Sequence, residues 1–328
     1  MHISKARITA IGSYVPERRL TNNDLEKLVE TNDEWITKRT GIKERRIAHE
    51  EEFTSDISYK AVRNLMERSK KSIDDVNMII VSTLTPDFKT PSVASLVQAK
   101  LGIHNAGAID LNAACAGFTY GLHLANALIT SGLHRKILVI GAETLSKITD
   151  YEDRSTCILF GDGGGAVLVE YDEHNPSFLA SHLGSEGEKG SSLYCSNLSS
   201  RMFEEELTNS GKIVQNGREV YKWAVTTVPK GVQRVLDQAS ISLRDVNWFV
   251  PHSANLRMIE SICEKIDFPL EKTLYSLVNY GNTSSATIPL SLDKALIEGN
   301  IRNGDKMLLY GFGGGLSYAG LLIHWNLD

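Results

Sequence analysis

Four points of the chain carry residue types that could form and stabilise an acyl intermediate. Cys115 lies in LNAACAGFTYG, His252 in PHSANLR, Asn282 in NYGNTSSA and Gly314 in YGFGGGLS. A thiolate attacks carbonyl carbon, while histidine, a carboxamide and backbone N–H groups manage protons and hold an oxyanion. Each residue alone also has an ordinary explanation as a buried small side chain, a surface histidine or a turn. The chemistry therefore depends on the fold bringing them together.

The setting of Cys115 distinguishes it from the other cysteines. It follows an extended run at 108–111 and opens an apolar helical pattern over 115–131 that ends at Gly132. A sulfur at a helix N-terminus faces unsatisfied amides and the positive end of the helix dipole, which stabilise a thiolate. The small neighbours would let a substrate carbonyl approach closely. We therefore predict a nucleophilic thiolate at Cys115.

Composition narrows the class of protein. The chain has 328 residues, 42% of them hydrophobic, and a net charge of -5 without a long basic run, which argues against nucleic-acid binding. It has neither a signal-peptide pattern nor an apolar run long enough to span a bilayer, so we expect a cytoplasmic protein that does not enter the membrane. Three further cysteines form no CxxC pair, which argues against a zinc site and structural disulfides. They are Cys157, Cys195 and Cys263.

Two pairs of similar segments point to an internal duplication. SIDDVNMIIV at 72–81 and SLRDVNWFVP at 242–251 share Ser, Asp, Val and Asn at matching places. KILVIG at 136–141 and KMLLYG at 306–311 also correspond. In both pairs the second segment begins 170 residues after the first (72 to 242 and 136 to 306), a spacing that we call the repeat offset. Two matches at one offset indicate a duplicated domain.

Each copy has a strand–helix–strand pattern, which predicts an α/β fold. The polar segment 184–212 between the copies is either a binding segment or a solvated connection. We divide the chain into halves at 1–173 and 174–328. The predicted strands are 78–81, 137–140, 248–250 and 307–310, and the predicted helices are 115–131 and 285–296.

Taken together and in order, these motifs resemble those of β-ketoacyl-[acyl-carrier-protein] synthase III, a starter-unit enzyme of the thiolase-fold superfamily. The likeness extends to TNDEWITKRTGIKER at 31–45 and DRSTCILFGDG at 153–163. Elongating synthases carry a second histidine, and thiolases a second cysteine, where this chain has Asn282. The resemblance implies two duplicated βαβαβαββ-type halves packed in five layers, and a homodimer.

The resemblance also implies a two-step reaction without a metal or redox cofactor. Cys115 would attack an acyl-CoA, with the amides of Cys115 and Gly314 holding the oxyanion. Malonyl-acyl-carrier protein would then lose carbon dioxide, and His252 and Asn282 would stabilise its enolate. The acyl-cysteine would react with that enolate to give the first 3-oxoacyl product of type II fatty-acid synthesis.

Further roles follow from the same resemblance. Relatives carry HQAN where this chain has HSAN, and we expect this change to have little effect on the chemistry. Some relatives carry a bulky aromatic residue where this chain has Thr90, so we expect room for branched or longer primers beside acetyl. The CoA-binding residues would be Thr31, Trp35, Arg39, Arg154, Asn255 and Arg257; the acyl pocket Thr90, Leu145, Phe160 and Phe312; and the carrier-protein surface Ser253, Ala254, Asn255, Leu256 and Arg257.

Three other functions remain open at the level of sequence. A related acyl-CoA-dependent ketosynthase of secondary metabolism would use the same residues with a different acceptor. A cysteine hydrolase also uses Cys, His and Asn, and would release its acyl group to water. A non-catalytic acyl-CoA-binding protein would have no need of Cys115, His252 and Asn282 together.

Overall fold

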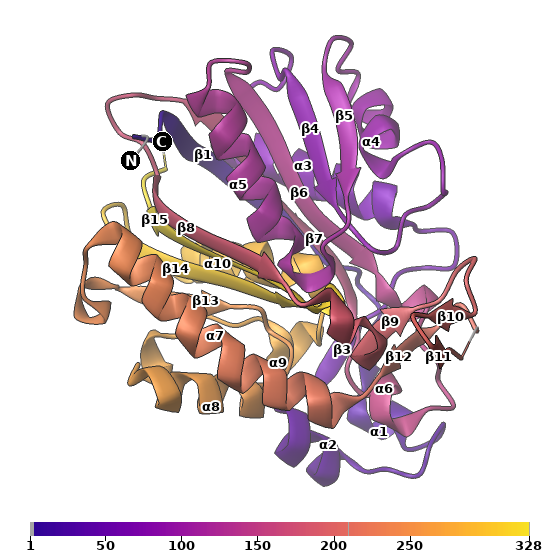
Figure 1. Cartoon of the computed structure of the whole chain (residues 1–328). Coiled ribbons are helices and arrows are strands. Elements are labelled where there is room, and N and C mark those ends of the chain that lie inside the picture. Colours follow the sequence, from indigo (N-terminus) through magenta and orange to yellow (C-terminus); the bar gives the residue numbers. More distant parts are fainter. Residues whose placement is uncertain (1–2, 209, 328) are drawn as a thin grey trace.

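The computed structural model describes residues 3–208 and 210–327 and contains two large sheets (Figure 1). In the first sheet, β4 (Met78–Ser82) is parallel to both of its neighbours, and β7 (Asp162–Tyr171) is antiparallel to both of its own. Strand β5 lies at one edge and β1 at the other. The strand order is β1 (Ala6–Tyr14), β7 (Asp162–Tyr171), β6 (Lys136–Thr144), β4 (Met78–Ser82) and β5 (Gly107–Leu111).

The second sheet repeats this arrangement without the outermost strand. Strands β13 and β14 are parallel, as β4 and β6 are, and β15 is antiparallel to both neighbours, as β7 is. The chain changes sheets between Tyr171 and Phe178. The strand order is β13 (Trp248–Pro251), β14 (Lys306–Gly313), β15 (Ser317–His324) and β8 (Phe178–Ser185).

Helices separate and cover the two sheets, which completes five layers (Figure 1). Side-chain caps begin several of them: Ser92 caps α4, Asn216 caps α7 and Asn255 caps α8. The predicted duplicated α/β fold is therefore confirmed. The outer helices are α3 (Thr54–Ser69) and α4 (Val93–Leu101) on one side and α7 (Gly217–Ala239) and α8 (Leu256–Ile266) on the other, with α5 (Gly117–Thr130) and α10 (Thr287–Ile297) between the sheets.

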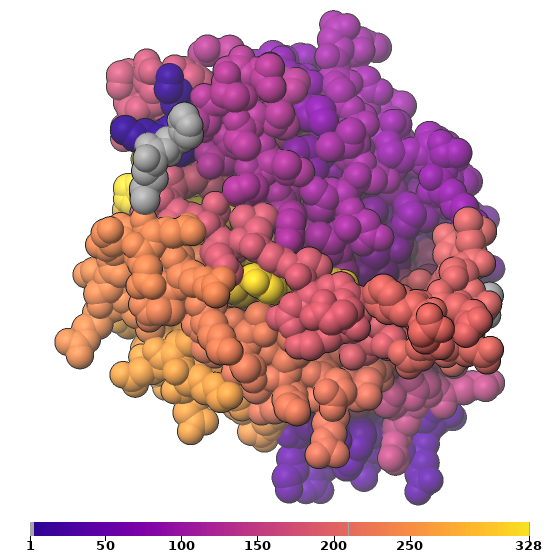
Figure 2. Space-filling model, viewed as in Figure 1, coloured from indigo at the N-terminus to yellow at the C-terminus, as the bar shows by residue number. Residues whose placement is uncertain are grey.

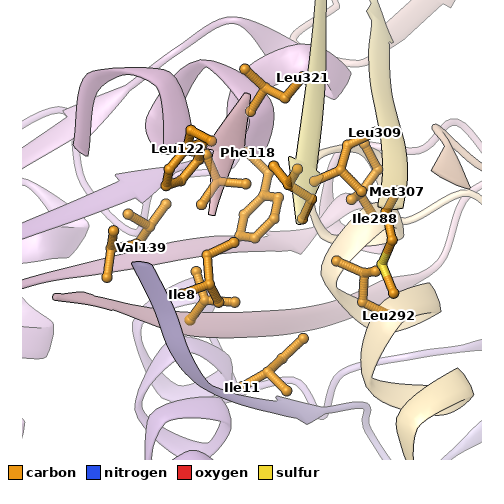
Figure 3. Packing of buried hydrophobic residues seen from close by; sticks show 14 of the residues in the cluster. Ile8, Ile11, Phe118, Leu122, Val139, Ile288, Leu292, Met307, Leu309 and Leu321 are labelled. Atoms are coloured by element: carbon orange, nitrogen blue, oxygen red, sulfur yellow. The ribbon is translucent and has the colours of Figure 1, made fainter. Parts of the chain in front are cut away.

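The central layer forms the core that joins the halves. Phe118 and Leu122 of α5 pack with Ile288 and Leu292 of α10, and β1, β6, β14 and β15 add apolar side chains from the two sheets (Figure 3). Both helices are buried over most of their surface, which explains why their sequences are apolar around most of the helix. Strand β6 is buried along its whole length because helices cover both faces of its sheet.

The predicted elements are all present, with longer strands than the short apolar runs indicated. The helix predicted over 115–131 is α5, preceded by the 3₁₀ turn η1 (Ala114–Ala116), and Gly132 ends it with a φ of 82°. The helix predicted over 285–296 is α10, preceded by the equivalent turn η6 (Ser284–Ala286). Cys115 thus lies in a 3₁₀ turn just before the helix.

The described part of the segment 184–212, which excludes residue 209, is more ordered than the polar composition indicated. Its strand β9 (Leu193–Cys195) pairs with β12 (Ile213–Gln215), and β10 (Arg201–Met202) pairs with β11 (Glu205–Glu206). In the space-filling view it lies on the surface where the two halves meet (Figure 2). Within the described residues, no helix combines the length and the apolar character needed to cross a membrane.

Several short elements complete the architecture. Strands β2 and β3 pair with each other, and α2 ends at Gly41, whose φ is 76°. The short elements are β2 (Arg19–Thr21), α1 (Asn22–Leu25), α2 (Asp33–Thr40), β3 (Glu44–Arg46), η2 (Leu145–Lys147), α6 (Arg154–Cys157), η3 (Gly187–Ser192), η4 (Leu243–Asp245), η5 (Leu270–Lys272), α9 (Leu277–Tyr280) and η7 (Gly314–Leu316).

Candidate active site

A cavity of about 1700 Å³ lies between the two halves and is lined by residues of both. Cys115 comes from the N-terminal half, whereas His252, Asn282 and Gly314 come from the C-terminal half. All four line this one cavity although the first and the last are far apart in the sequence. The fold therefore assembles the residues whose chemistry the sequence singled out.

The turn that carries Cys115 packs against glycines of the other half. A Cβ atom on Gly311 would lie 2.8 Å from the Cα of Ala116, and one on Gly313 would lie 2.7 Å from the Cys115 sulfur. Ala114 adopts a φ of 43°, which L residues rarely take. The sulfur can occupy its place only because β14 has no side chains at these two points.

The sulfur is nearly buried, and this burial dominates its acidity. Desolvation raises the pKa of the Cys115 thiol to about 11, with a smaller contribution from a negative charge on Glu143. The Ser284 hydroxyl and the amides of Gly314 and Cys115 lower it by smaller amounts. The resting sulfur is therefore a protonated thiol. The thiolate that the sequence predicts is therefore not the favoured form, because the loss of water outweighs the amides at the turn.

His252 is held by a hydrogen bond that determines its tautomer. Its Nδ1 lies 2.8 Å from Thr287 Oγ1, which donates its only hydrogen to the Ser284 carbonyl 2.9 Å away. Thr287 must then accept from Nδ1–H, so Nε2 of the neutral ring carries a lone pair. Burial lowers the pKa of His252 to about 3. The neutral ring packs edge-on against Phe312.

Asn282 presents its amide group in one defined orientation. Its Oδ1 accepts from the Ser284 amide at 2.9 Å, and its own backbone is hydrogen-bonded to Leu159 and Gly161. The Nδ2 group is left to donate to a ligand in the cavity. Asn282 and Ser284 of the turn before α10 and Thr287, the first residue of α10, thus form one short segment that serves both His252 and Cys115.

Apolar residues form the wall of the cavity near β9 and η2. Three of the four residues predicted for an acyl pocket line it, namely Leu145, Phe160 and Phe312. Thr90 does not line this cavity; it lies in a separate shallow groove beside Phe88 and the edge strand β5. The wall also includes Leu84, Leu159, Leu193 and Ile213, which sequence reasoning had not identified.

The solvent-exposed part of the cavity lining, which we call its entrance, is cationic. Arg39 and Arg154 both lie over the Trp35 indole, with guanidinium carbons 5.3 and 5.0 Å from the ring centroid. Among the described residues that line the cavity, five are Lys or Arg and none is Asp or Glu, although the chain carries a net charge of -5. The five are Lys38, Arg39, Arg154, Arg218 and Arg257.

The segment after His252 connects α8 to α2. Asn255 Nδ2 donates to the Arg39 carbonyl at 3.2 Å, and Arg257 Nε donates to the Lys38 carbonyl at 2.9 Å. Ala254, Asn255 and Arg257 line the cavity, whereas Leu256 packs on Gly41.

Two residues of the predicted binding sets face inward. Ser253 is completely buried and its hydroxyl accepts from the Ser276 amide, so its side chain does not reach the surface. Thr31 is not part of the cavity lining, and its buried hydroxyl has no partner among the described residues.

Sequence reasoning did not identify Ser284 and Thr287, or the buried Glu143 behind them. The repeat offset could have found this region, because it pairs Cys115 with Ser285 and Glu143 with Gly313. Lys38 and Arg218 also went unnoticed, since single surface-type cations carry no pattern. All four cysteines are free thiols; Cys157 and Cys263 are buried, and Cys195 is exposed.

Comparison with known protein families agrees with this site. The model of 3-oxoacyl-[acyl-carrier-protein] synthase III matches residues 109–187, and the model of the C-terminal domain of that enzyme matches residues 236–325. The first match contains the Cys115 turn. The second contains His252, Asn282 and the glycine cluster.

The chain is also similar to curated proteins along its whole length. It is 71% identical to beta-ketoacyl-[acyl-carrier-protein] synthase III 2 of Halalkalibacterium halodurans, with 100% of this chain and 98% of that protein covered. It is 60% identical to the protein of the same name from Bacillus subtilis, with 99% and 100% covered.

Solved structures give the same result. The synthase III of Thermus thermophilus matches with a TM-score of 0.94 and 44% identity, covering 97% of this chain and 99% of that one. The priming beta-ketosynthase of the R1128 polyketide pathway matches with a TM-score of 0.90 and 33% identity, covering 98% and 96%. Both the fold and these relatives place the chain in one group of condensing acyltransferases. It belongs to the β-ketoacyl-[acyl-carrier-protein] synthase III family.

Proposed function

We propose that the enzyme joins an acyl-CoA primer to malonyl-acyl-carrier protein through an acyl-Cys115 intermediate. The observation that carries this proposal is the placement of Cys115, His252, Asn282 and the Gly314 amide around one cavity with a cationic entrance. A thiol, a proton acceptor, a carboxamide donor and an oxyanion donor are the parts that such a reaction needs.

In the first step, the Cys115 sulfur attacks the thioester carbon of the primer. The thiol proton passes to Nε2 of His252 as the C–S bond forms, because burial disfavours a free thiolate and Nε2 carries the lone pair of the ring. The negative charge of the oxyanion offsets the positive charge of the imidazolium. The amides of Cys115 and Gly314 stabilise the tetrahedral oxyanion. The bond to CoA then breaks, and CoA leaves as a thiolate that takes a proton from water.

In the second step, the protonated His252 and the Asn282 amide donate to the thioester oxygen of the malonyl group. Loss of carbon dioxide leaves an enolate, whose carbon attacks the acyl-cysteine carbonyl. The new C–C bond forms, the bond to sulfur breaks, and Cys115 regains its proton from His252. No metal or redox cofactor takes part in this proposed sequence.

The cationic entrance supports a nucleotide-bearing primer. Trp35 and Arg154 offer two flat faces for an adenine ring, and the other basic residues at the entrance suit its phosphates. Arg154 now contacts the indole directly, so the base would enter as the guanidinium moves aside. We expect Trp35→Ala to raise KM for acyl-CoA about tenfold and to change kcat little, measured by steady-state acylation.

We assign the carrier protein to the surface beside the cavity entrance. Ala254, Asn255, Leu256 and Arg257 are at least partly exposed there, and Arg257 can meet an acidic partner or the phosphate of its prosthetic arm. Ser253 is assigned a structural role instead, because it is buried.

We further propose a homodimer formed along β5. This edge strand exposes Ile109, and Phe88 and Thr90 lie in the groove beside it, so a second copy would cover both an unpaired edge and apolar side chains. Thr90 would then reach toward the acyl pocket of the partner. Ile109→Lys should convert a dimer to a monomer in analytical ultracentrifugation, whereas a protein monomeric before the change would refute the assignment.

Primer preference follows from the same arrangement. A threonine leaves more room than an aromatic side chain, so we expect comparable turnover of acetyl-CoA and isobutyryl-CoA. A strict preference for acetyl-CoA would contradict this.

The proposed function is tested by mass mapping after incubation with acyl-CoA, followed by malonyl-acyl-carrier protein. We expect an adduct on Cys115 that is converted into a 3-oxoacyl-carrier protein. An adduct that persists would point to a different acceptor, such as that of a polyketide pathway. An adduct lost to water without any acceptor would point to a hydrolase.

A further inference from the structure

The two halves carry equivalent turns, and only the turn of the N-terminal half carries the nucleophile. Asn112 Oδ1 accepts from the Ala114 amide at 3.3 Å, and Asn282 Oδ1 accepts from the Ser284 amide at 2.9 Å, one repeat offset later in the chain. Ala114 and Ser284 share a positive φ, at 43° and 48°. In this correspondence, Ser285 occupies the place of Cys115.

The surroundings of Ser285 and Cys115 differ at one decisive position. The equivalent of Glu143 is Gly313, where the missing side chain leaves space for the Cys115 sulfur. Glu143 instead fills this space beside Ser285, and it is completely buried. One turn is therefore open to ligands and the other is closed by a carboxyl group.

The hydrogen bonds around Glu143 saturate one of its oxygens. Oε2 accepts from the Thr83 hydroxyl at 3.0 Å, from the Leu84 amide at 3.1 Å and from the Thr85 hydroxyl at 2.7 Å. These three groups follow directly after β4. Glu143 thus holds the end of that strand, and its second oxygen faces the other half.

The second carboxyl oxygen of Glu143, Oε1, contacts the hydroxyl of Ser285. Ser285 Oγ is 2.9 Å from Glu143 Oε1 and 2.9 Å from the Ser82 carbonyl oxygen. The carbonyl can only accept, and Ser285 has one hydrogen to donate. Both short contacts are favourable only if Oε1 itself carries a hydrogen and donates it to Ser285. Burial, which raises the pKa of Glu143, favours the same protonated state.

We propose that Glu143 is a neutral carboxylic acid and a positioning residue, which holds the turn Asn282–Ser285 through Ser285 for the condensation step. The turn supplies the Asn282 amide and the Ser284 carbonyl that anchors Thr287 and His252. A neutral Glu143 also spares Cys115 the repulsion of a buried anion, which would raise its pKa. The condensation role rests on the proposed function above, whereas the protonation state does not.

The protonation state is tested by infrared difference spectroscopy of the whole enzyme against Glu143→Gln at pH 7. We expect the wild-type protein to contribute the carbonyl stretch of a protonated carboxylic acid, which the variant lacks. Carboxylate stretches in its place would overturn the inference. This measurement needs no substrate, so its outcome is independent of whether Cys115 is acylated.

The positioning role is tested by separating the two half-reactions. Glu143→Gln, whose amide can both donate and accept, should keep the condensation rate within about threefold, whereas Ser285→Ala should lower it about tenfold. Acylation of Cys115 should change less than about threefold in both variants.

Ser58→Ala is the matched control, because it removes a buried hydroxyl of α3 whose one hydrogen bond within the described residues goes to the Thr54 carbonyl. We expect it to leave both half-reactions unchanged. Equal losses of acylation and condensation in Ser285→Ala, or a condensation loss in Glu143→Gln of about 100-fold, would overturn the positioning role. Absence of acylation in the wild-type protein would instead refute the proposed function.

Discussion

The turns around Cys115 and Ser285 share a backbone and differ in access. Each lies just before a central helix and packs on a glycine of the opposite half: Gly311 admits the first turn and Gly141 the second. A Cβ on Gly141 would lie 2.5 Å from the Ser285 carbonyl oxygen, comparable with the contact at Gly311. The same crossing of the halves therefore builds one reactive turn and one supporting turn.

This difference shows that reactivity depends on a few side chains, because the backbone of the turn is the same in both halves. Gly313 leaves the Cys115 sulfur facing the cavity, and Glu143 closes the same space beside Ser285. The reactive turn supplies the nucleophile, while the supporting turn supplies Asn282 to the nucleophile of the other half. Duplication thus allows the two copies to specialise while remaining interlocked.

The largest effect should come from changing the side chains at the two equivalent positions, Cys115 and Ser285. Cys115→Ser should lower turnover by about 10³-fold or more and abolish the acyl adduct in mass mapping, because the hydroxyl is a far weaker nucleophile here. Adding Ser285→Cys to that variant should restore nothing, since Glu143 and burial close the site.

Cys263→Ser provides the control, because Cys263 is buried outside the cavity and should leave the adduct in place. An adduct on a cysteine at position 285 would contradict the idea that the second turn is closed.

The second test distinguishes a thiol from a thiolate at the reactive turn. With the pKa of Cys115 raised to about 11, its thiolate fraction grows about tenfold per pH unit. The rate of alkylation by iodoacetamide should therefore rise about 100-fold between pH 7 and pH 9, after subtraction of labelling in Cys115→Ser protein. A rate that levels off below pH 8 would show that the amides of the turn prevail over burial.

The third test compares the two glycines that receive the turns. Gly311→Ala and Gly141→Ala should each lower the free energy of unfolding by about 1–3 kcal/mol, because a methyl group would overlap the opposing backbone. Gly311→Ala should also slow acylation, and Gly141→Ala should mainly slow condensation. Denaturant unfolding and the two half-reaction assays check this.

Gly187→Ala is the control for those glycines, since, apart from its chain neighbours, no described residue lies within 4 Å of the added Cβ. It should change stability by less than about 0.5 kcal/mol. Equal kinetic profiles for Gly311→Ala and Gly141→Ala would contradict the division of labour between the turns.

The smallest effect concerns pH and His252. The folded pKa is lowered to about 3 from 6.5, so below pH 6.5 the unfolded chain binds a proton that the folded enzyme does not. Stability from this residue is present above pH 6.5 and is lost as the pH falls toward 3, by about 1.4 kcal/mol per unit. Between pH 7 and pH 5.5, the free energy of unfolding of His252→Gln should fall by about 1 kcal/mol less than that of the wild type. Parallel pH profiles would contradict a buried neutral imidazole.

Much of the fold could be predicted from the chain alone. The apolar runs predicted the strands β4, β6, β13 and β14, because strands covered on both faces need continuous hydrophobic residues. The constant repeat offset predicted the duplication. The role of Glu143 opposite Gly313 in that repeat could not be predicted, since a carboxyl in an apolar strand has no pattern of its own.

The sequence by itself determined the duplicated α/β frame and which residue types were available for acyl chemistry, because local hydrophobic patterns and side-chain reactivity are properties of the chain. Only the tertiary structure decided the protonation of Cys115 and His252, the closure of the turn at Ser285, and the separation of Thr90 from the cavity. These properties depend on burial and on contacts between residues far apart in sequence, which arise only when the two halves interlock.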